Sequence, residues 1–269
     1  SAYAARALQL MGDLVFLVDT SGSRSGESSV VAPGLDAWAK NLATKGLDIK
    51  FGCVGYHYTG VNGGIDMGDV DAMDNCINNR TNHTSGQTRT QGFAGDNAAA
   101  LEAAKGPYTN TGNYECGVRA LRFANDHYDF RYGANRIYVN LTDEPNQPNG
   151  EEYFSVEQIH PDWKWNSNDG TIHTVYSASS NFTHVLYHTE HPWLMSDNTG
   201  GSKMLDVDQN YTGVNLSDFP VTGALRNAYR VTFRAPASTR DAATTHNVKI
   251  TILSKDGAVK AVKEYEAEW

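Results

Sequence analysis

The sequence predicts a three-layer α/β protein, in which helices flank both faces of a mostly parallel, doubly wound β-sheet. Residues 13–18, DLVFLV, are almost continuously apolar, which is typical of a central parallel strand that is covered on both faces. Apolar residues then recur at helical spacing from 28 to 45, and a second strand-like run follows at 48–58. Strand, helix and strand in this order indicate a β-α-β unit with a right-handed crossover.

The segment 59–112 is rich in Gly, Asn, Asp and Thr. We expect it to be a long insertion over the ligand-binding end of the sheet, with one short helix near 96–105. Beyond it, helices and strands alternate again. We expect helices at 115–128 and near 155–160, strands at 136–141 and 171–178, and a helical region, a Gly-Gly turn and an edge strand within 184–207.

The last part of the chain has a different pattern. Apolar and polar residues alternate, and a Lys-Asp-Gly turn lies at 255–257, which favours antiparallel β-hairpin structure. We therefore expect a main domain over 1–226 and a β-hairpin extension over 227–269, packed on or beside it.

Composition excludes several classes of protein. The chain has 269 residues, of which 40% are hydrophobic and 20% charged, and its net charge is -9. This acidity disfavours nucleic acid as a partner, because it repels phosphate. No apolar run approaches the roughly 20 residues that span a membrane. The N-terminal residues lack the features of a signal peptide, and we expect the chain to be part of a larger protein or assembly.

Cys53, Cys76 and Cys116 are the three cysteines. Cys53 lies in a strand-like run, where a small buried thiol is the simplest interpretation. Cys76 and Cys116 flank a loop-rich stretch, so a disulfide between them is plausible in an oxidising compartment. This favours an extracytoplasmic location, at a cell surface or secreted.

The segment DLVFLVDTSGS carries the strongest functional signal. It places Asp19, Ser21 and Ser23 directly after a buried strand, at the sheet edge where α/β proteins bind ligands. Asp143 ends a second strand of this kind. One carboxylate and two hydroxyls can turn their oxygens toward one point, and hard cations such as Mg²⁺ prefer oxygen ligands. The competing interpretation is a turn with local hydrogen bonds.

DLVFLVDTSGS together with VNLTDE resembles the von Willebrand factor A family, over about residues 10–210. The resemblance implies a metal-ion-dependent adhesion site for Mg²⁺, Ca²⁺ or Mn²⁺. In it, Asp19, Ser21 and Ser23 match the D-x-S-x-S loop, and Asp143 matches the later aspartate. NTGG at 198–201 resembles the family's turn before its last strand.

One position departs from the family pattern. Where the family places a threonine ligand, this chain has Glu115. Thr109 and Thr111 are the competing candidates for that role. A glutamate favours tighter cation binding, but it can also occupy the position that a partner needs.

The resemblance implies a non-enzymatic module, whose metal binds a carboxylate on a protein or other macromolecule. The alternative is a structural or assembly domain, in which a closed metal only stabilises the fold. Metal-assisted hydrolysis lacks a candidate general base outside the ligand set. His184, His188 and His191 have partly helical zinc spacing but lack the H-E-x-x-H glutamate, and we expect them to pack rather than to bind zinc.

Overall fold

In the computed structural model, the chain forms two compact units, Ser1–Ala228 and Tyr229–Trp269. The structure describes residues 10–20, 38, 41–42, 44–45, 47–73, 91–162, 164–166, 168–177, 189–207, 245–253 and 259–268.

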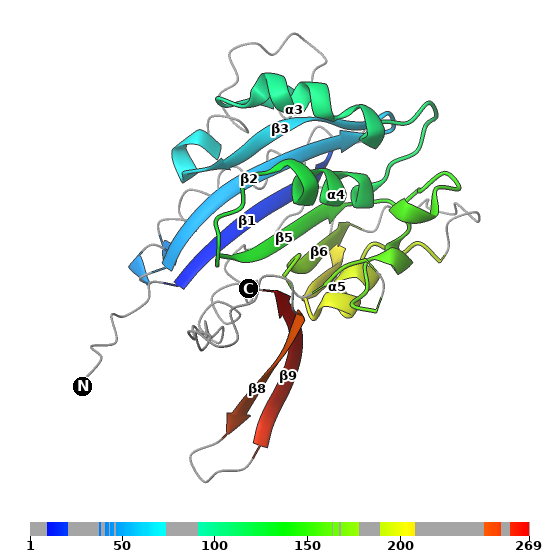
Figure 1. Ribbon diagram of the computed structural model, residues 1–269. Coiled ribbons are helices and arrows are strands. Elements are labelled where there is room, and N and C mark those ends of the chain that lie inside the picture. Colours follow the sequence, from blue (N-terminus) through cyan, green and yellow to red (C-terminus); the bar gives the residue numbers. More distant parts are fainter. Residues whose placement is uncertain are drawn as a thin grey trace. The chain divides into compact units, whose positions relative to one another are not determined.

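The first unit is built on a seven-stranded sheet of order β4-β3-β2-β1-β5-β6-β7 (Figure 1). Strands β1, β2, β5, β6 and β7 run parallel, whereas β3 is antiparallel to β2 and β4 is parallel to β3. The strands are β1 Leu10–Asp19, β2 Leu47–His57, β3 Gly60–Gly68, β4 Gly92–Ala94, β5 Asn135–Thr142, β6 Thr171–Ser177 and β7 Lys203–Val207. The predicted α/β class and mostly parallel sheet are confirmed.

Alternation along β1 gives each face of the sheet its own core. Phe16 and Val18 belong to one cluster, which also contains Trp38 from the first helical segment. Val15 and Leu17 belong to the other cluster, which contains much of the helix at 117–127. Because β1 is buried on both faces, its sequence is a nearly unbroken apolar run.

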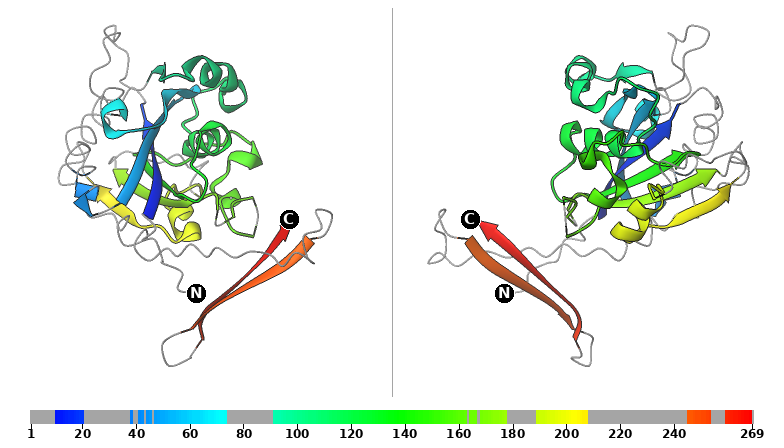
Figure 2. Two further views of the ribbon diagram at one scale, coloured as in Figure 1. Left: turned by 60° about the vertical axis from the view of Figure 1, so that its left-hand side comes forward. Right: turned by 90° about the vertical axis from the view of Figure 1, so that its right-hand side faces the viewer.

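The second core is covered by α3 Ala98–Ala104 and α4 Gly117–His127, which lie on the same face of the sheet (Figure 2). A further helix, α5 Leu194–Thr199, ends at Gly200 in the left-handed conformation, as the Gly-Gly turn predicted. The helices expected at 96–105 and 115–128 are confirmed. Of the one expected at 28–45, the described residues Trp38, Asn41, Leu42 and Thr44 are helical, and Lys45 lies in a turn.

Two predictions of local structure were wrong. The helix expected near 155–160 is a pair of 3-10 turns, η2 Glu152–Phe154 and η3 Val156–Gln158, with a third such turn, η1, at Gly106–Tyr108. Extended Ser155 separates η2 from η3 and accepts a hydrogen bond from the Glu157 amide. The expected insertion at 59–112 begins instead with β3, which extends the sheet as a hairpin partner of β2.

The second unit contains an antiparallel hairpin of β8 Thr245–Leu253 and β9 Val259–Glu268. Its predicted turn at 255–257 lies outside the described residues. Within the described ranges of both units, no helix is long and apolar enough to cross a membrane.

Candidate metal centre

The sheet brings the predicted site residues Asp19 and Asp143 to one edge. The chain leaves β1 for β2, β3 and β4 on one side and returns to β5 on the other. The carboxyl ends of β1 and β5 therefore flank the point where strand order reverses, which is the usual ligand site of an open α/β sheet. Asp19 is the last residue of β1, and Asp143 directly follows β5.

Both aspartates are almost fully buried, with 1% and 2% of their surface exposed. Thr142, the last residue of β5, donates a hydrogen bond from Oγ1 to Oδ2 of Asp19 over 3.1 Å. The same hydroxyl accepts a bond from the backbone amide of Glu144 at 3.2 Å. Thr142 therefore ties the end of β1 to the loop that carries the second aspartate.

Glu115 reaches the edge from the segment before α4. Its backbone amide donates to Oε1 of Gln147 at 3.2 Å, and its carbonyl accepts from the Gln147 amide at 2.8 Å. Nε2 of Gln147 also donates to Oε2 of Glu144 at 2.8 Å. Gln147 thus holds Glu115 and Glu144 beside each other.

The charged groups that act most strongly on Glu115 are themselves acidic. Burial and the neighbouring Asp19, Glu144 and Asp143 carboxylates raise the pKa of Glu115 to about 10. A carboxyl with this pKa keeps its proton at neutral pH and hydrogen bonds to Glu144. Its Oε2 atom is buried and has no hydrogen-bond partner among the described residues. This edge of the sheet is therefore rich in oxygen atoms that can bind a cation, and its acidic groups disfavour further negative charge.

The Tyr56 and Asn140 side chains form a closely packed polar pair next to these carboxyl groups. The Tyr56 hydroxyl donates to Oδ1 of Asn140 at 3.1 Å, and both side chains are buried. A Cβ at Gly117 would come within 3.2 to 3.3 Å of these two side chains. Because residue 117 is a glycine, α4 can begin in close contact with Tyr56 and Asn140. This contact fixes the position of Glu115, just before the helix.

The structure also places the competing candidates. Thr109 uses Oγ1 to bond its own turn, at the Gly106 carbonyl, and Thr111 is exposed. Ser21, Ser23, His184 and His188 lie outside the described residues, and the His191 ring stacks on Trp193. In the part of the chain that the structure describes, no three His, Cys, Asp or Glu side chains are arranged as a metal-binding group. The ligand set stays a prediction.

Sequence reasoning missed Glu144 and Gln147 as parts of this site. Glu144 directly follows the predicted ligand Asp143, and this adjacency is a signal that could have indicated it. Gln147 has no comparable signal, because its role depends on the loop folding back onto residue 115.

The suggested disulfide between Cys76 and Cys116 is not formed, because Cys116 is a free thiol. Its Sγ is buried and donates to Oδ1 of Asn146 at 3.1 Å. Burial raises the pKa of the Cys116 thiol to about 12, so the group stays protonated. Cys76 lies outside the described residues. Cys53 is a buried free thiol in β2, as expected.

Comparison with known proteins assigns no family. No family model matches the chain, and neither does any curated protein. Similar solved structures include an aerotolerance-related membrane protein from Bacteroides fragilis, with 10% identity, a TM-score of 0.39, and coverage of 74% of this chain and 93% of that one. The open conformation of the pilus adhesin SpaC from Lactobacillus rhamnosus GG has 12% identity and a TM-score of 0.39, over 80% and 29%. The human COPII-coat protein Sec24c has 10% identity and a TM-score of 0.29, over 73% and 30%. The chain thus spans less than a third of the adhesin and of the coat protein, and similarities this slight carry no functional assignment.

Proposed function

We propose that this chain is a divalent-cation-dependent binding module, whose cation is held at the carboxyl edge of β1 and β5. The observation that carries the proposal is the buried group of Asp19, Glu115 and Asp143 with half-buried Glu144 beside it, in which the neighbouring acidic groups disfavour a negative charge on Glu115. A divalent cation removes this repulsion, because it supplies positive charge among oxygen ligands.

The proposed donors are of the chemical type that a hard cation prefers. Asp19 and Asp143 supply carboxylates from neighbouring strand ends, and Glu115 presents a buried Oε2 that lacks a hydrogen-bond partner in the described chain. The proposed set is completed by the hydroxyls of Ser21 and Ser23, on the D-x-S-x-S pattern. When bound, Mg²⁺, Ca²⁺ or Mn²⁺ supplies a Lewis-acidic position that accepts an oxygen of a partner's carboxylate.

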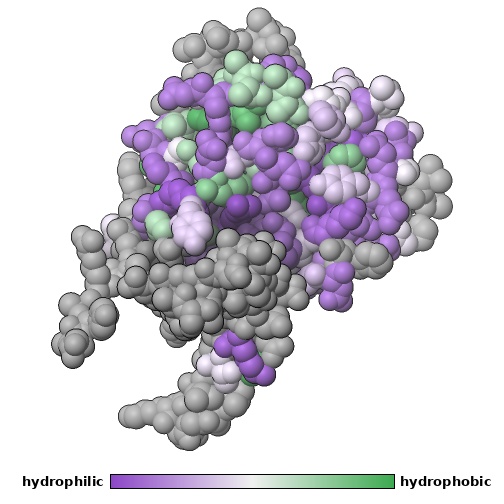
Figure 3. Space-filling view, in the orientation of Figure 1, coloured by the Kyte–Doolittle hydropathy of each residue, from purple (hydrophilic) through white to green (hydrophobic). Residues whose placement is uncertain are grey.

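A polar partner suits the described surface. The face shown in Figure 3 is mostly hydrophilic, and its main apolar region lies over α3, whose exposed residues are the small Ala99, Ala100 and Ala103 together with charged Glu102. Recognition on this face therefore depends on charge and hydrogen bonds more than on apolar burial. We propose a macromolecular partner, an extracytoplasmic setting and a binding rather than catalytic role.

A second candidate function is supported by the way Glu115 is held. Gln147 fixes it through two backbone bonds, and its carboxyl is buried. A glutamate fixed in this way can fill the last position on the cation, which would then only stabilise a domain of a larger assembly. The two candidates differ in whether the bound cation keeps an exchangeable position.

Titration calorimetry of Mg²⁺, Ca²⁺ and Mn²⁺ into chelator-stripped protein tests the site. We expect binding to be lost in Asp19→Asn and kept in Asp162→Asn, whose side chain is 85% exposed. Equal binding by both variants would reject the site. Water-proton relaxation of the Mn²⁺ complex then separates the candidates. An exchangeable inner-sphere water supports the binding module, and its absence supports the structural role.

A further inference from the structure

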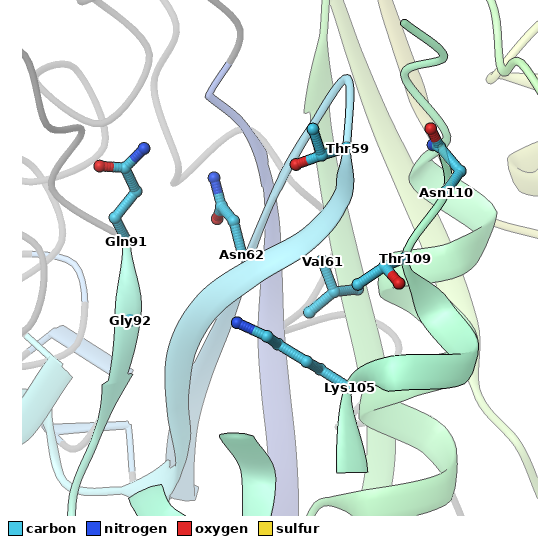
Figure 4. Close-up of a pocket in the computed structure, with 8 residues that line it drawn as sticks. All are labelled: Thr59, Val61, Asn62, Gln91, Gly92, Lys105, Thr109 and Asn110. Atoms are coloured by element: carbon cyan, nitrogen blue, oxygen red, sulfur yellow. The ribbon is translucent and has the colours of Figure 1, made fainter. Parts of the chain in front are cut away.

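A cavity of about 500 Å³ lies at the same sheet edge, between β3, β4 and the segment after η1. Its polar lining comes from Thr59, Asn62, Gln91, Lys105, Thr109 and Asn110 (Figure 4). Backbone contacts fix one wall of the cavity. Gly60 has a φ of 95° and forms a β-bridge with Thr109. The Asn110 amide donates a hydrogen bond to the Thr59 carbonyl at 3.0 Å. A cavity of this volume accommodates a small organic ligand.

Asn62 has a fixed orientation beside this cavity. Thr20 uses its hydroxyl hydrogen on the Tyr56 carbonyl, at 2.8 Å, so its oxygen can only accept from Asn62. The amide nitrogen of Asn62 must therefore face Thr20. Its Oδ1 is left as a buried acceptor without a hydrogen-bond partner in the described residues. A ligand hydroxyl in the cavity can satisfy this acceptor once the atoms that cover it shift.

Among the described residues that line the cavity, Lys105 is the one charged side chain. In Figure 4 it extends from the end of α3 toward the side where Asn62 lies. Its ammonium pairs with Glu102, but the two side chains are 29% and 53% exposed. Because an exposed ion pair contributes little stability, the ammonium is available to a carboxylate that enters the cavity.

We propose that this cavity binds an acidic sugar unit, such as a uronic acid, with the sugar's carboxylate on Lys105 and its hydroxyls on Asn62 and the neighbouring amide and hydroxyl side chains. Carboxamides and hydroxyls both donate and accept, which matches a ligand with many hydroxyl groups. A single lysine fits one negative charge, whereas phosphate sites usually combine several cations or backbone amides. Val61 is the one apolar side chain in the described part of the lining, so an apolar peptide anchor would find little surface there.

This inference goes beyond the proposed function and does not depend on it. The cavity lining includes none of Asp19, Glu115 and Asp143. Sugar binding is therefore expected in chelator as well as in Mg²⁺. The sugar proposal therefore stands if the metal proposal fails, and the metal proposal stands if sugar binding fails.

The test is a heteronuclear NMR titration of the chelator-treated protein with methyl glucuronide, and in parallel with neutral methyl glucoside, at constant ionic strength. We expect shifts at the Gly92 and Asn110 amides and the Asn62 carboxamide, and weaker binding of the glucoside by about fivefold or more, since a charged hydrogen bond is lost. Lys105→Gln should reduce glucuronide affinity to the level of glucoside. Thr59→Val should weaken both sugars.

Lys203→Gln is the matched control, because Lys203 is also an exposed lysine paired with an acidic side chain, Asp197. It should bind both sugars as the original chain does. The proposal is overturned if glucuronide shifts no cavity residue, or if Lys105→Gln and Lys203→Gln have equal effects. It is also overturned if an Asp/Glu-rich peptide binds the cavity and the sugar does not.

Discussion

The hydroxyl of Thr142 donates a hydrogen bond to Oδ2 of Asp19 over 3.1 Å, which joins the carboxyl ends of β5 and β1. These strands are adjacent in space, although the two residues are 123 positions apart in the sequence. The bond orients the first aspartate of the D-x-S-x-S segment. Because Thr142 also accepts from the Glu144 amide, it couples that orientation to the loop carrying Asp143.

Thr142→Val keeps the shape of the side chain but removes both bonds. We expect it to lower the free energy of unfolding by about 1–3 kcal/mol, because a buried carboxylate loses a donor, and to weaken cation binding. Urea denaturation and calorimetry measure the two effects. Thr174→Val is the matched control. Thr174 lies in β6 of the same sheet, and the change deletes its buried hydroxyl, which is hydrogen-bonded to the Ser196 hydroxyl. It should lower stability and leave cation affinity unchanged. If Thr142→Val and Thr174→Val bind cations with equal affinity, Thr142 does not couple the orientation of Asp19 to the loop that carries Asp143.

Glu115→Gln removes one carboxyl from a buried acidic cluster. We expect the chelator-treated variant to be more stable than the original chain by about 1–3 kcal/mol, because the folded chain no longer has to hold a proton on a carboxyl surrounded by acidic groups. The stabilisation by added Ca²⁺ or Mg²⁺ should shrink at the same time. Melting temperatures with and without chelator measure both. Glu157→Gln, at an exposed position, should change neither. A destabilised Glu115→Gln without cation would show that the carboxyl contributes through its hydrogen bond rather than through repulsion.

The sequence was most informative where burial leaves a simple pattern. Strands β1 and β5 were predicted because both faces of these strands are covered, which requires apolar residues at successive positions. Asp19 and Asp143 could be placed at one edge because parallel strands bring their carboxyl ends together. The proposal of Glu115 rather than Thr109 as a ligand rests on the bonds of Gln147, which hold a distant loop against residue 115. No local pattern encodes such a contact.

Strand β3 was missed because GVNGGIDMG contains few residues with high strand propensity. The glycines of β3 allow close approach of the backbone and contribute no side chains to the core. Gly64 has a φ of 148°, and a Cβ there would lie 2.1 Å from the Cys53 carbonyl oxygen. The strand therefore forms through close pairing with β2, which a hydrophobic pattern does not reveal.

Gly64→Ala should consequently destabilise the first unit strongly. We expect a loss of at least about 2 kcal/mol, since the new methyl group meets backbone atoms and the conformation disfavours side chains. Gly106→Ala is the control, because a Cβ at Gly106 has no heavy atom within 4 Å. It should be neutral or slightly stabilising, through the lower entropy of the unfolded chain. Chemical denaturation of the two variants decides the matter. Similar losses in both would mean that the contact with β2 is not the cause.

His173 predicts a specific dependence of stability on pH. Its Nδ1 accepts from the Ser202 amide at 3.0 Å, which requires the neutral ring, and burial lowers its pKa to about 4. An unfolded histidine has a pKa near 6.5, so between these values the unfolded chain binds the extra proton. Stability from this group is complete above pH 6.5 and is lost as the pH falls toward 4, by up to about 3 kcal/mol.

His173→Gln should therefore flatten the stability profile between pH 7 and 4, which urea denaturation at a series of pH values measures. His160→Gln is the control, because the His160 side chain is 37% exposed, and it should keep the slope of the original chain. Titration of carboxylates contributes equally to both variants, so the difference between their profiles isolates the buried ring. If that difference stays constant from pH 7 to 4, the folded chain takes up a proton on His173 as readily as the unfolded chain does, and burial does not hold the ring neutral.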